Sequence, residues 1–359
     1  MLTFLRTAYA LQWYAMTARF ATPDEITNWD THILANPDGG NVFASYEYAQ
    51  QKETGGYRAR FAFVGTTAIT IHEKNAGPLG RLWYLPKGPG VTTTKELFAV
   101  LEALKPLAAK HNVFAIRIES ELPRSAQPTL ARHGLIKARP IIPNPSTITL
   151  DISARIDDVL MSLPQKGRHA IRRAERDGVT VEAVKASDKN CRILFDLLAL
   201  TAEGQFGIRS HEYYRAFWQR FERAGLGQIF FATYEGKIVA GAFAMSFGTK
   251  STYLIGASVR KRTAYGASHL LQWHVIEWAK SKGALLHDFC GAPPSEEINN
   301  PEHPHYGIGQ FKTAFNKTVI DYIGCYDLVI KPSQYKLWSL AGERIARRVH
   351  TYKHHDSYY

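Results

Sequence analysis

The feature that most restricts the fold of this sequence is an alternation of strand-like and helix-like segments, which occurs twice along the chain. Short runs rich in β-branched and aromatic residues indicate strands, and apolar residues that repeat every three or four positions indicate helices. Leu97, Leu101 and Leu104, for example, fall on one face of an expected helix. The first series is expected to contain strands at 57–65, 67–75, 81–89 and 113–120 and a helix at 92–111.

The second series repeats this logic. A Glu-Gly pair at 235–236 predicts a hairpin turn, and Lys282-Gly283 is typical of a helix end. The repeated order predicts an internal duplication of an α+β unit. The expected elements are helices at about 157–177, around 194–200 and at 264–283, a hairpin at 227–248, and strands at 179–184, 251–259, 285–291 and 318–330.

The length of 359 residues exceeds that of one typical domain. We expect a first domain over 1–150, completed by residues 325–359, and a second domain over 151–324. Residues 1–15 are interpreted as an upstream extension, because strand-like sequence begins only after Met16. No stretch approaches about 18 unbroken apolar residues, so we predict no membrane-spanning helix.

The charge balance indicates a polyanionic partner. Lysine and arginine total 44 against 32 acidic residues, a formal net charge of +12. RNA, a diphosphate or an anionic lipid surface would each suit such a surplus. The three cysteines, Cys191, Cys290 and Cys325, are widely spaced and odd in number, which favours a reduced, cytoplasmic protein.

Several segments occur in the order typical of a known family, from about Tyr46 to Ile330. The segments are YLPKGPGV (84–91), LPQKGRHAIRRAERDGVTVE (163–182), YEGKIVAGAFAMSFG (234–248), YLIGAS (253–258), LLQWHVIEWAKSKGALLHDFCG (270–291), GIGQFKTAF (307–315) and YIGCYDLVI (322–330). They resemble the Fem peptidyltransferases, tRNA-dependent enzymes that build or begin peptidoglycan cross-bridges.

The resemblance implies an α+β (α/β) fold of two tandem GNAT-like domains, with the substrate in a cleft between them and a C-terminal strand that returns to the first domain. Some members insert a helical hairpin as a coiled-coil arm, but the run from Asp157 to Gly178 leaves no room for one. The glycine turn that binds acetyl-coenzyme A in GNAT enzymes is out of register at residues 262–267. We therefore expect no cofactor.

Phe311 and Lys312 match the Phe-Lys pair that the family places at the tRNA end. Aminoacyl transfer from an ester to an amine passes through an oxyanion, which a positioned cation stabilises. By this resemblance Lys312 steadies the oxyanion while Phe311 packs beside it. The alternative is a surface lysine next to a core phenylalanine.

Four residues match family positions that bind the precursor. By resemblance Lys52 contacts its diphosphate, Arg209 and Tyr213 hold it, and Tyr253 lines the cleft. The spacing of Arg209 and Tyr213 would place both on one helix face, and a guanidinium binds phosphate through paired hydrogen bonds. A solvated helix face is the alternative for Lys52, and an exposed helix start over a packed aromatic is the alternative for Arg209 and Tyr213.

Two basic helices stand out. Lys166 and the arginines 168, 172 and 176 form a ridge that would bind the tRNA backbone, unless it is only a solvated face. His169 and Arg173 belong to the same cluster. Residues 337–355 form a basic amphipathic helix that would lie on the inner membrane face or pack against the first domain.

Two further patterns in the sequence indicate a function less clearly. His287, Cys290, His303 and His305 look like metal ligands, but residues three apart on a strand point to opposite faces, so we predict no metal site. Thr92 and Cys325 stand where the family has acids that receive the acceptor's ammonium. A shifted acid, Asp288 or Asp327, is one alternative.

The sequence thus predicts an enzyme, an aminoacyltransferase that moves an amino acid from aminoacyl-tRNA to the stem-peptide amine of UDP-MurNAc-pentapeptide or of a lipid-linked precursor. A related transferase acting on a protein N-terminus or a lipid is a second hypothesis, supported by Thr92 and Cys325. A non-catalytic module that binds RNA or precursor is a third. The expected location is cytoplasmic, with contact at the inner membrane face left open.

Overall fold

The chain divides into two compact units, and each is an α+β structure around its own sheet. A computed structural model describes residues 16–202, 207–259, 264–354 and 358–359. One unit comprises Met1–Pro145 and Tyr322–Tyr359, and the other comprises Ser146–Asp321. These limits lie a few residues before those expected from the sequence.

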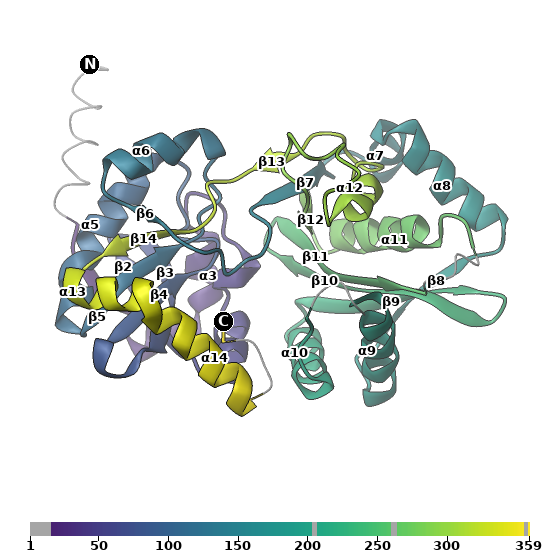
Figure 1. Ribbon diagram of the computed structural model, residues 1–359. Helices are drawn as coiled ribbons and strands as arrows, with labels where there is room; N and C mark the ends of the chain where they lie inside the picture. The colour runs from purple at the N-terminus through teal and green to yellow at the C-terminus, as the bar shows by residue number, and fades with distance from the viewer. Residues whose placement is uncertain (1–15, 203–206, 260–263, 355–357) are drawn as a thin grey trace, which may run out of the picture. The chain divides into compact units, whose positions relative to one another are not determined.

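Unit 1 contains the elements from β1 to β6 and from β14 to the C-terminus (Figure 1). Its strands are β1 (Ala18–Phe20), β2 (Arg58–Val64), β3 (Thr67–Asn75), β4 (Arg81–Leu85), β5 (Val113–Ile118), β6 (Ile136–Lys137) and β14 (Tyr326–Val329). Its α-helices are α2 (Pro23–Thr27), α3 (Trp29–Leu34), α4 (Tyr46–Glu53), α5 (Thr94–Lys110), α6 (Gln127–Arg132), α13 (Pro332–Leu337) and α14 (Glu343–His354). Short 3-10 turns η1 (Val42–Ala44), η2 (Gly77–Leu79) and η3 (Arg124–Ala126) and a π-helical turn η4 (Trp338–Gly342) complete it.

Unit 2 contains the elements from β7 to β13. Its strands are β7 (Ser146–Asp151), β8 (Thr180–Val184), β9 (Gly227–Tyr234), β10 (Lys237–Phe247), β11 (Lys250–Ser258), β12 (Leu286–Gly291) and β13 (Ile320–Asp321). Its helices are α7 (Ile156–Ser162), α8 (Gln165–Arg176), α9 (Asp188–Ala202), α10 (His211–Arg223), α11 (Ala267–Ser281) and α12 (Tyr306–Lys312).

The two sheets have the same pattern of pairing. Unit 1 has the order β1-β2-β3-β4-β5-β14-β6 and unit 2 the order β8-β9-β10-β11-β12-β7-β13. In both, the first four strands are antiparallel, the fourth and fifth are parallel, and the last two pair antiparallel. A helix, α5 or α11, connects each parallel pair, as a parallel crossover requires. The two-unit α+β fold expected from the sequence is confirmed.

The helix expected at about 157–177 is wrong in one respect, because it is broken into α7 and α8. Leu163 adopts an extended conformation and Pro164 follows it. A residue before proline is disfavoured in the helical region, and proline has no N–H to donate. The chain therefore turns at this point, and α7 and α8 are too short for a coiled-coil arm.

Local sequence explains the other elements near the site. Thr93 caps α5 in a reciprocal capping box with Glu96. Glu235 and Gly236 both have positive φ, as the two-residue turn between β9 and β10 requires. On β11, Leu254 is an extra residue between the paired Tyr253 and Ile255. Such a bulge turns the strand locally.

Helices cover both faces of the unit 2 sheet. Figure 1 shows α9 and α10 on one face and α8, α11 and α12 on the other. Neighbouring β9 residues follow this division: Phe230 packs against Trp278 of α11, whereas Phe231 lies outside the cluster on that face. On β10, Phe243 packs against Phe217 and Trp218 of α10. Alternate residues of a strand point to opposite faces, so each face has an apolar core.

In unit 1 the C-terminal elements are fastened to β5 by a buried ion pair. The Arg117 guanidinium donates to both carboxylate oxygens of Asp327 on β14, at 2.8 and 2.9 Å. It also donates to Glu343 at the start of α14, and the Tyr359 hydroxyl donates to the same carboxylate. Among the described residues, no helix is both long and apolar enough to cross a membrane.

Candidate functional site

The parallel strands β11 and β12 separate partway along unit 2. Their pairing ends at Thr252 and Asp288, whereas β12 stays paired with β7 on its other side as far as Gly291, with a register irregularity between Asp288 and Gly291. The Asp288 carboxylate holds this bend by accepting hydrogen bonds from the Thr147 hydroxyl and from the backbone N–H of Cys290. Cys290 has a φ of 59°. The bend turns backbone carbonyl groups of β12 toward α12.

Lys312, the last residue of α12, binds these carbonyl groups. Its Nζ donates to the carbonyl oxygen of Cys290 at 3.0 Å and to that of Gly291 at 2.6 Å. The side chain is 7% exposed. An ammonium has three N–H donors, so two are used and the third has no partner in the described part of the chain. Burial lowers the pKa of Lys312, and nearby Cys290 and Asp288 act in the opposite direction.

Aromatic side chains lie in the same part of unit 2 as this lysine. Phe311 is half-buried and packs against Phe315 and His269, with ring centroids 5.6 and 5.0 Å apart. Tyr253 of β11 is half-buried, and burial, with the neighbouring Cys290 thiol, raises the pKa of its phenol well above the ordinary value. The structure therefore brings Phe311, Lys312 and Tyr253 to the same part of unit 2, and Lys312 is not a surface lysine.

The basic ridge lies on α8, which packs against the end of the Lys312 helix. A methyl group added to Gly167 would lie 2.0 Å from the carbonyl oxygen of Ala314. The apolar face of α8 is buried, and Lys166, Arg172 and Arg176 are exposed on the other face.

Arg168 differs from its expected place in this ridge. Its guanidinium donates to the carbonyl oxygens of Met161, at 2.9 Å, and Leu163. Arg168 thus provides hydrogen-bond donors for carbonyl groups at the end of α7, which the break before Pro164 leaves without helical partners.

Arg209 and Tyr213 form a pair, although not on one helix as expected. Ser210 caps α10, so Arg209 lies before the helix and Tyr213 within its first turn. The guanidinium of Arg209 still lies 4.5 Å from the Tyr213 ring centroid. Helix α10 covers the sheet face opposite α12 (Figure 1).

Lys52, in unit 1, does not lie on a solvated helix face. It is 8% exposed, and its Nζ lies 5.0 Å from the centroid of the Tyr57 ring. Lys74 lies 4.4 Å from the same ring. Burial, and the charge of Lys52, lower the pKa of the neighbouring His72. Two buried ammonium groups therefore share one aromatic ring.

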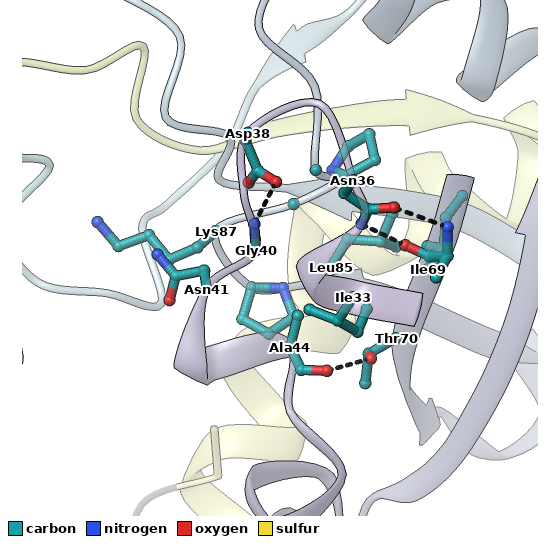
Figure 2. Close-up of a pocket in the computed structure, with 15 residues that line it drawn as sticks. Ile33, Asn36, Asp38, Gly40, Asn41, Ala44, Ile69, Thr70, Leu85 and Lys87 are labelled. Carbon is teal, nitrogen blue, oxygen red and sulfur yellow. Dashed lines mark hydrogen bonds between the residues drawn. The ribbon is translucent and has the colours of Figure 1, made fainter. Parts of the chain in front are cut away.

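The Pro-Lys-Gly-Pro segment at 86–89 lines a hollow in unit 1 (Figure 2). Asn36 fixes this region, because its side-chain amide exchanges two hydrogen bonds with the backbone of Ala68. The side chain of Lys87 extends away from the hollow and forms an ion pair with Glu121 at 3.2 Å.

Lys87 also lines a second hollow, which contains a buried acid, Glu119, that the sequence did not reveal. The carboxylate accepts hydrogen bonds from Tyr84 and from two backbone N–H groups, and burial raises its pKa. It has no ion pair within 4.0 Å in the described residues. The hydroxyl of Ser120, which lines the same hollow, is buried and has no hydrogen-bond partner among the described residues. No sequence pattern distinguishes Glu119, because it directly follows β5, an ordinary buried strand.

The residues in place of the family acids have other partners. Thr92 donates to Glu96 at the start of α5, and burial raises the pKa of the buried Cys325 thiol. Asp327 is bound to Arg117, and Asp288 holds the β12 bend. Cys325 lies near Glu119, whose charge also raises the pKa of the thiol.

The residues that resembled metal ligands do not converge. His287 is fully buried between the Ser251 hydroxyl and the Gln272 amide, each 2.7 Å away, and burial lowers its pKa to about 3. Within the described residues, no group of three or more His, Cys, Asp or Glu side chains could hold a metal ion.

The chain resembles known proteins in sequence and in fold. A sequence model of the FemAB family matches residues 222–343, a stretch that contains Tyr253, Phe311 and Lys312. The crystal structure of FemX covers 91% of this chain and 100% of its own, with a TM-score of 0.75 at 20% identity. The resemblance to the Fem family is confirmed.

Relatives of this Fem-like chain include two enzymes named lipid II:glycine glycyltransferase. One, from Staphylococcus aureus (strain MRSA252), is 20% identical over 89% of this chain and 94% of that protein. Another, from Staphylococcus saprophyticus, is 32% identical, but over 29% of this chain and 24% of that protein. The C-terminal domain of a putative lysylphosphatidylglycerol synthetase from Agrobacterium fabrum, with a TM-score of 0.50 at 16% identity, shares the fold alone.

Proposed function

We propose that this chain is an acyltransferase that moves an amino acid from aminoacyl-tRNA to the stem-peptide amine of a peptidoglycan precursor. The observation that carries the proposal is the buried Lys312 ammonium, which is fixed by two carbonyl groups and keeps one N–H donor. A cation held where water is excluded stabilises a developing oxyanion without reorganising. The glycyltransferase relatives, named for lipid II, favour a lipid-linked acceptor.

In the proposed reaction, the acceptor amine attacks the carbonyl carbon of the aminoacyl ester. Lys312 donates its remaining N–H to the oxyanion, and Phe311 excludes water beside it. The ester C–O bond then breaks, the amide forms, and the tRNA hydroxyl leaves with the proton given up by the amine. We assign no side chain as general base.

The remaining residues would hold the two substrates. Lys166, Arg172 and Arg176 would bind the phosphates of the tRNA acceptor end, because α8 packs directly against the end of α12. Lys52 and the Arg209–Tyr213 pair would bind the precursor. Glu119 would receive a cationic group of the acceptor, since a buried carboxylate without an ion pair gains from an ammonium partner.

The proposal is tested by transfer of radiolabelled amino acids from a pool of charged tRNA to UDP-MurNAc-pentapeptide and to lipid-linked precursor in parallel. Acceptors with lysine and with diaminopimelate are both supplied. Label that reaches a precursor, and fails to do so after RNase treatment, supports the proposal and identifies the acceptor. If no precursor is labelled, the proposal is wrong.

A further inference from the structure

The C-terminal helix α14 presents two different faces. Glu343, Ala346, Arg347 and His350 repeat at helical spacing and face unit 1. Glu343 is bound to Arg117, and the Arg347 guanidinium lies 5.1 Å from the centroid of the Tyr359 ring. His350 packs against the ring of Tyr358. This face fixes the helix in a defined orientation.

The opposite face of α14 exposes large apolar side chains. Ile345, Val349 and Tyr352 lie four and three residues apart, which places them on one side of the helix. Leu340 of the preceding turn η4 and Leu337 at the end of α13 are exposed apolar side chains as well. These five side chains are between 46% and 84% exposed. A folded protein gains nothing by leaving such a set in water, so the cluster indicates a docking surface.

The charge around this surface identifies its partner. Arg344 and Arg348 are exposed beside the apolar residues, and neither has an ion-pair partner within the described chain. Residues 331–354 contain six lysines and arginines and one acid, Glu343, which is occupied by Arg117. An apolar stripe bordered by arginines is the pattern of a helix that lies in the interface of an anionic bilayer.

A second copy of the chain fits this surface less well. In a symmetric pair the same patch would face itself, so the arginines of both copies would approach one another. We propose that α14 and the turn before it dock unit 1 on a membrane surface that contains anionic phospholipid. Ile345, Val349 and Tyr352 would enter the headgroup region, and Arg344 and Arg348 would bind lipid phosphates. The proposal rests on unit 1 alone and does not depend on the transfer reaction.

The test is sedimentation of the full chain with vesicles of phosphatidylcholine, with and without phosphatidylglycerol. We expect binding only to the vesicles that contain phosphatidylglycerol, and weaker binding as salt is added. The double variant I345E/V349E should bind at least about tenfold more weakly, because two inserted apolar side chains are lost. The control I136E/M161E changes side chains of similar exposure elsewhere and should bind like the wild type.

Thermal unfolding of both double variants shows whether they fold. Equal vesicle binding by the wild type and folded I345E/V349E would overturn the proposal, as would equal loss in the two double variants. Failure of the wild type to bind, together with self-association that I345E/V349E abolishes, would make the surface a contact between copies instead.

Discussion

Gly167 of α8 lies against the backbone of Ala314 so closely that no larger residue fits between them. A Cβ at this position would come within 2.0 Å of the Ala314 carbonyl oxygen and 3.0 Å of its carbonyl carbon. Both atoms belong to the backbone, which cannot rotate away as a flexible side chain could. The contact fixes the basic helix against the chain that follows Lys312.

We therefore expect Gly167→Ala to lower the free energy of unfolding by about 1–3 kcal/mol, the usual result of overpacking. Gly307→Ala is the matched control, because this α12 glycine has no atom within 4 Å of an added Cβ. Alanine there should be neutral or stabilise by about 0.5–1 kcal/mol, as in other helix interiors. Urea unfolding measures both, and equal stability of the two variants would contradict the close contact.

Lys312→Ala should lower kcat for aminoacyl transfer by about 10²–10³-fold with little change in KM, because an oxyanion donor acts only in the transition state. Lys312→Arg keeps the charge and should restore part of the rate. Lys317→Ala, at an exposed lysine five residues along, should leave transfer unchanged. Steady-state assays measure kcat and KM for each variant. A near-normal kcat in folded Lys312→Ala would show that the lysine has no part in the transfer step.

Glu343 should make the folded protein sensitive to acid. Burial raises the pKa of this carboxyl, but hydrogen bonds and charge from Arg117 and Tyr359 lower it more, so it lies below its ordinary value of 4.5. A depressed folded pKa contributes stability that is complete above pH 4.5 and is lost as the pH falls through the folded value.

Glu343→Gln should therefore be less stable than the wild type by about 1.5–3 kcal/mol at neutral pH, and the difference should shrink below pH 4.5. Urea unfolding across this pH range measures the difference. Glu102→Gln removes an exposed acid and should change stability by less than about 0.5 kcal/mol throughout. A difference that stays constant with pH would show that Glu343 does not titrate as inferred.

Local patterns in the sequence predicted most of the elements. The helix α11 and the hairpin of β9 and β10 follow from apolar periodicity and from a turn pair that tolerates positive φ. The pairing partners of β7 and β14 did not follow from local pattern. Each is the sixth strand of its sheet and pairs with strands that are distant in the sequence. Such pairing depends on contacts between distant segments, which a local pattern does not contain.

For the candidate site, the sequence indicated the residues that belong to a recognisable motif. It did not reveal the residues whose role depends only on their three-dimensional surroundings. The Lys312 motif is continuous in sequence, so the family resemblance could indicate this lysine, and its catalytic role stays a prediction. Arg168 resembled its neighbours in the basic ridge, and only the break before Pro164 turns its guanidinium onto backbone carbonyls. Glu119 was missed because burial and hydrogen bonding, rather than its place at a strand end, distinguish it from other glutamates.

Glu119→Gln tests whether this buried acid recognises a cation of the acceptor. The change keeps the size of the side chain and removes its charge, so KM for a precursor with a free lysine amine should rise about tenfold or more, with kcat little changed. Equilibrium binding gives a second measurement that needs no transfer. The wild type should bind the free-lysine precursor more tightly than its Nε-acetylated form, and Glu119→Gln should bind both alike.

Glu121→Gln is the control, since Glu121 lies two residues away and is paired with Lys87 instead. It should preserve the preference for the free amine, because an acid already neutralised by lysine attracts a second ammonium weakly. Urea unfolding shows whether either variant loses the native state. A preference that survives in folded Glu119→Gln would assign the amine site elsewhere and leave Glu119 as a structural acid that anchors the backbone at Ile141 and Ile142.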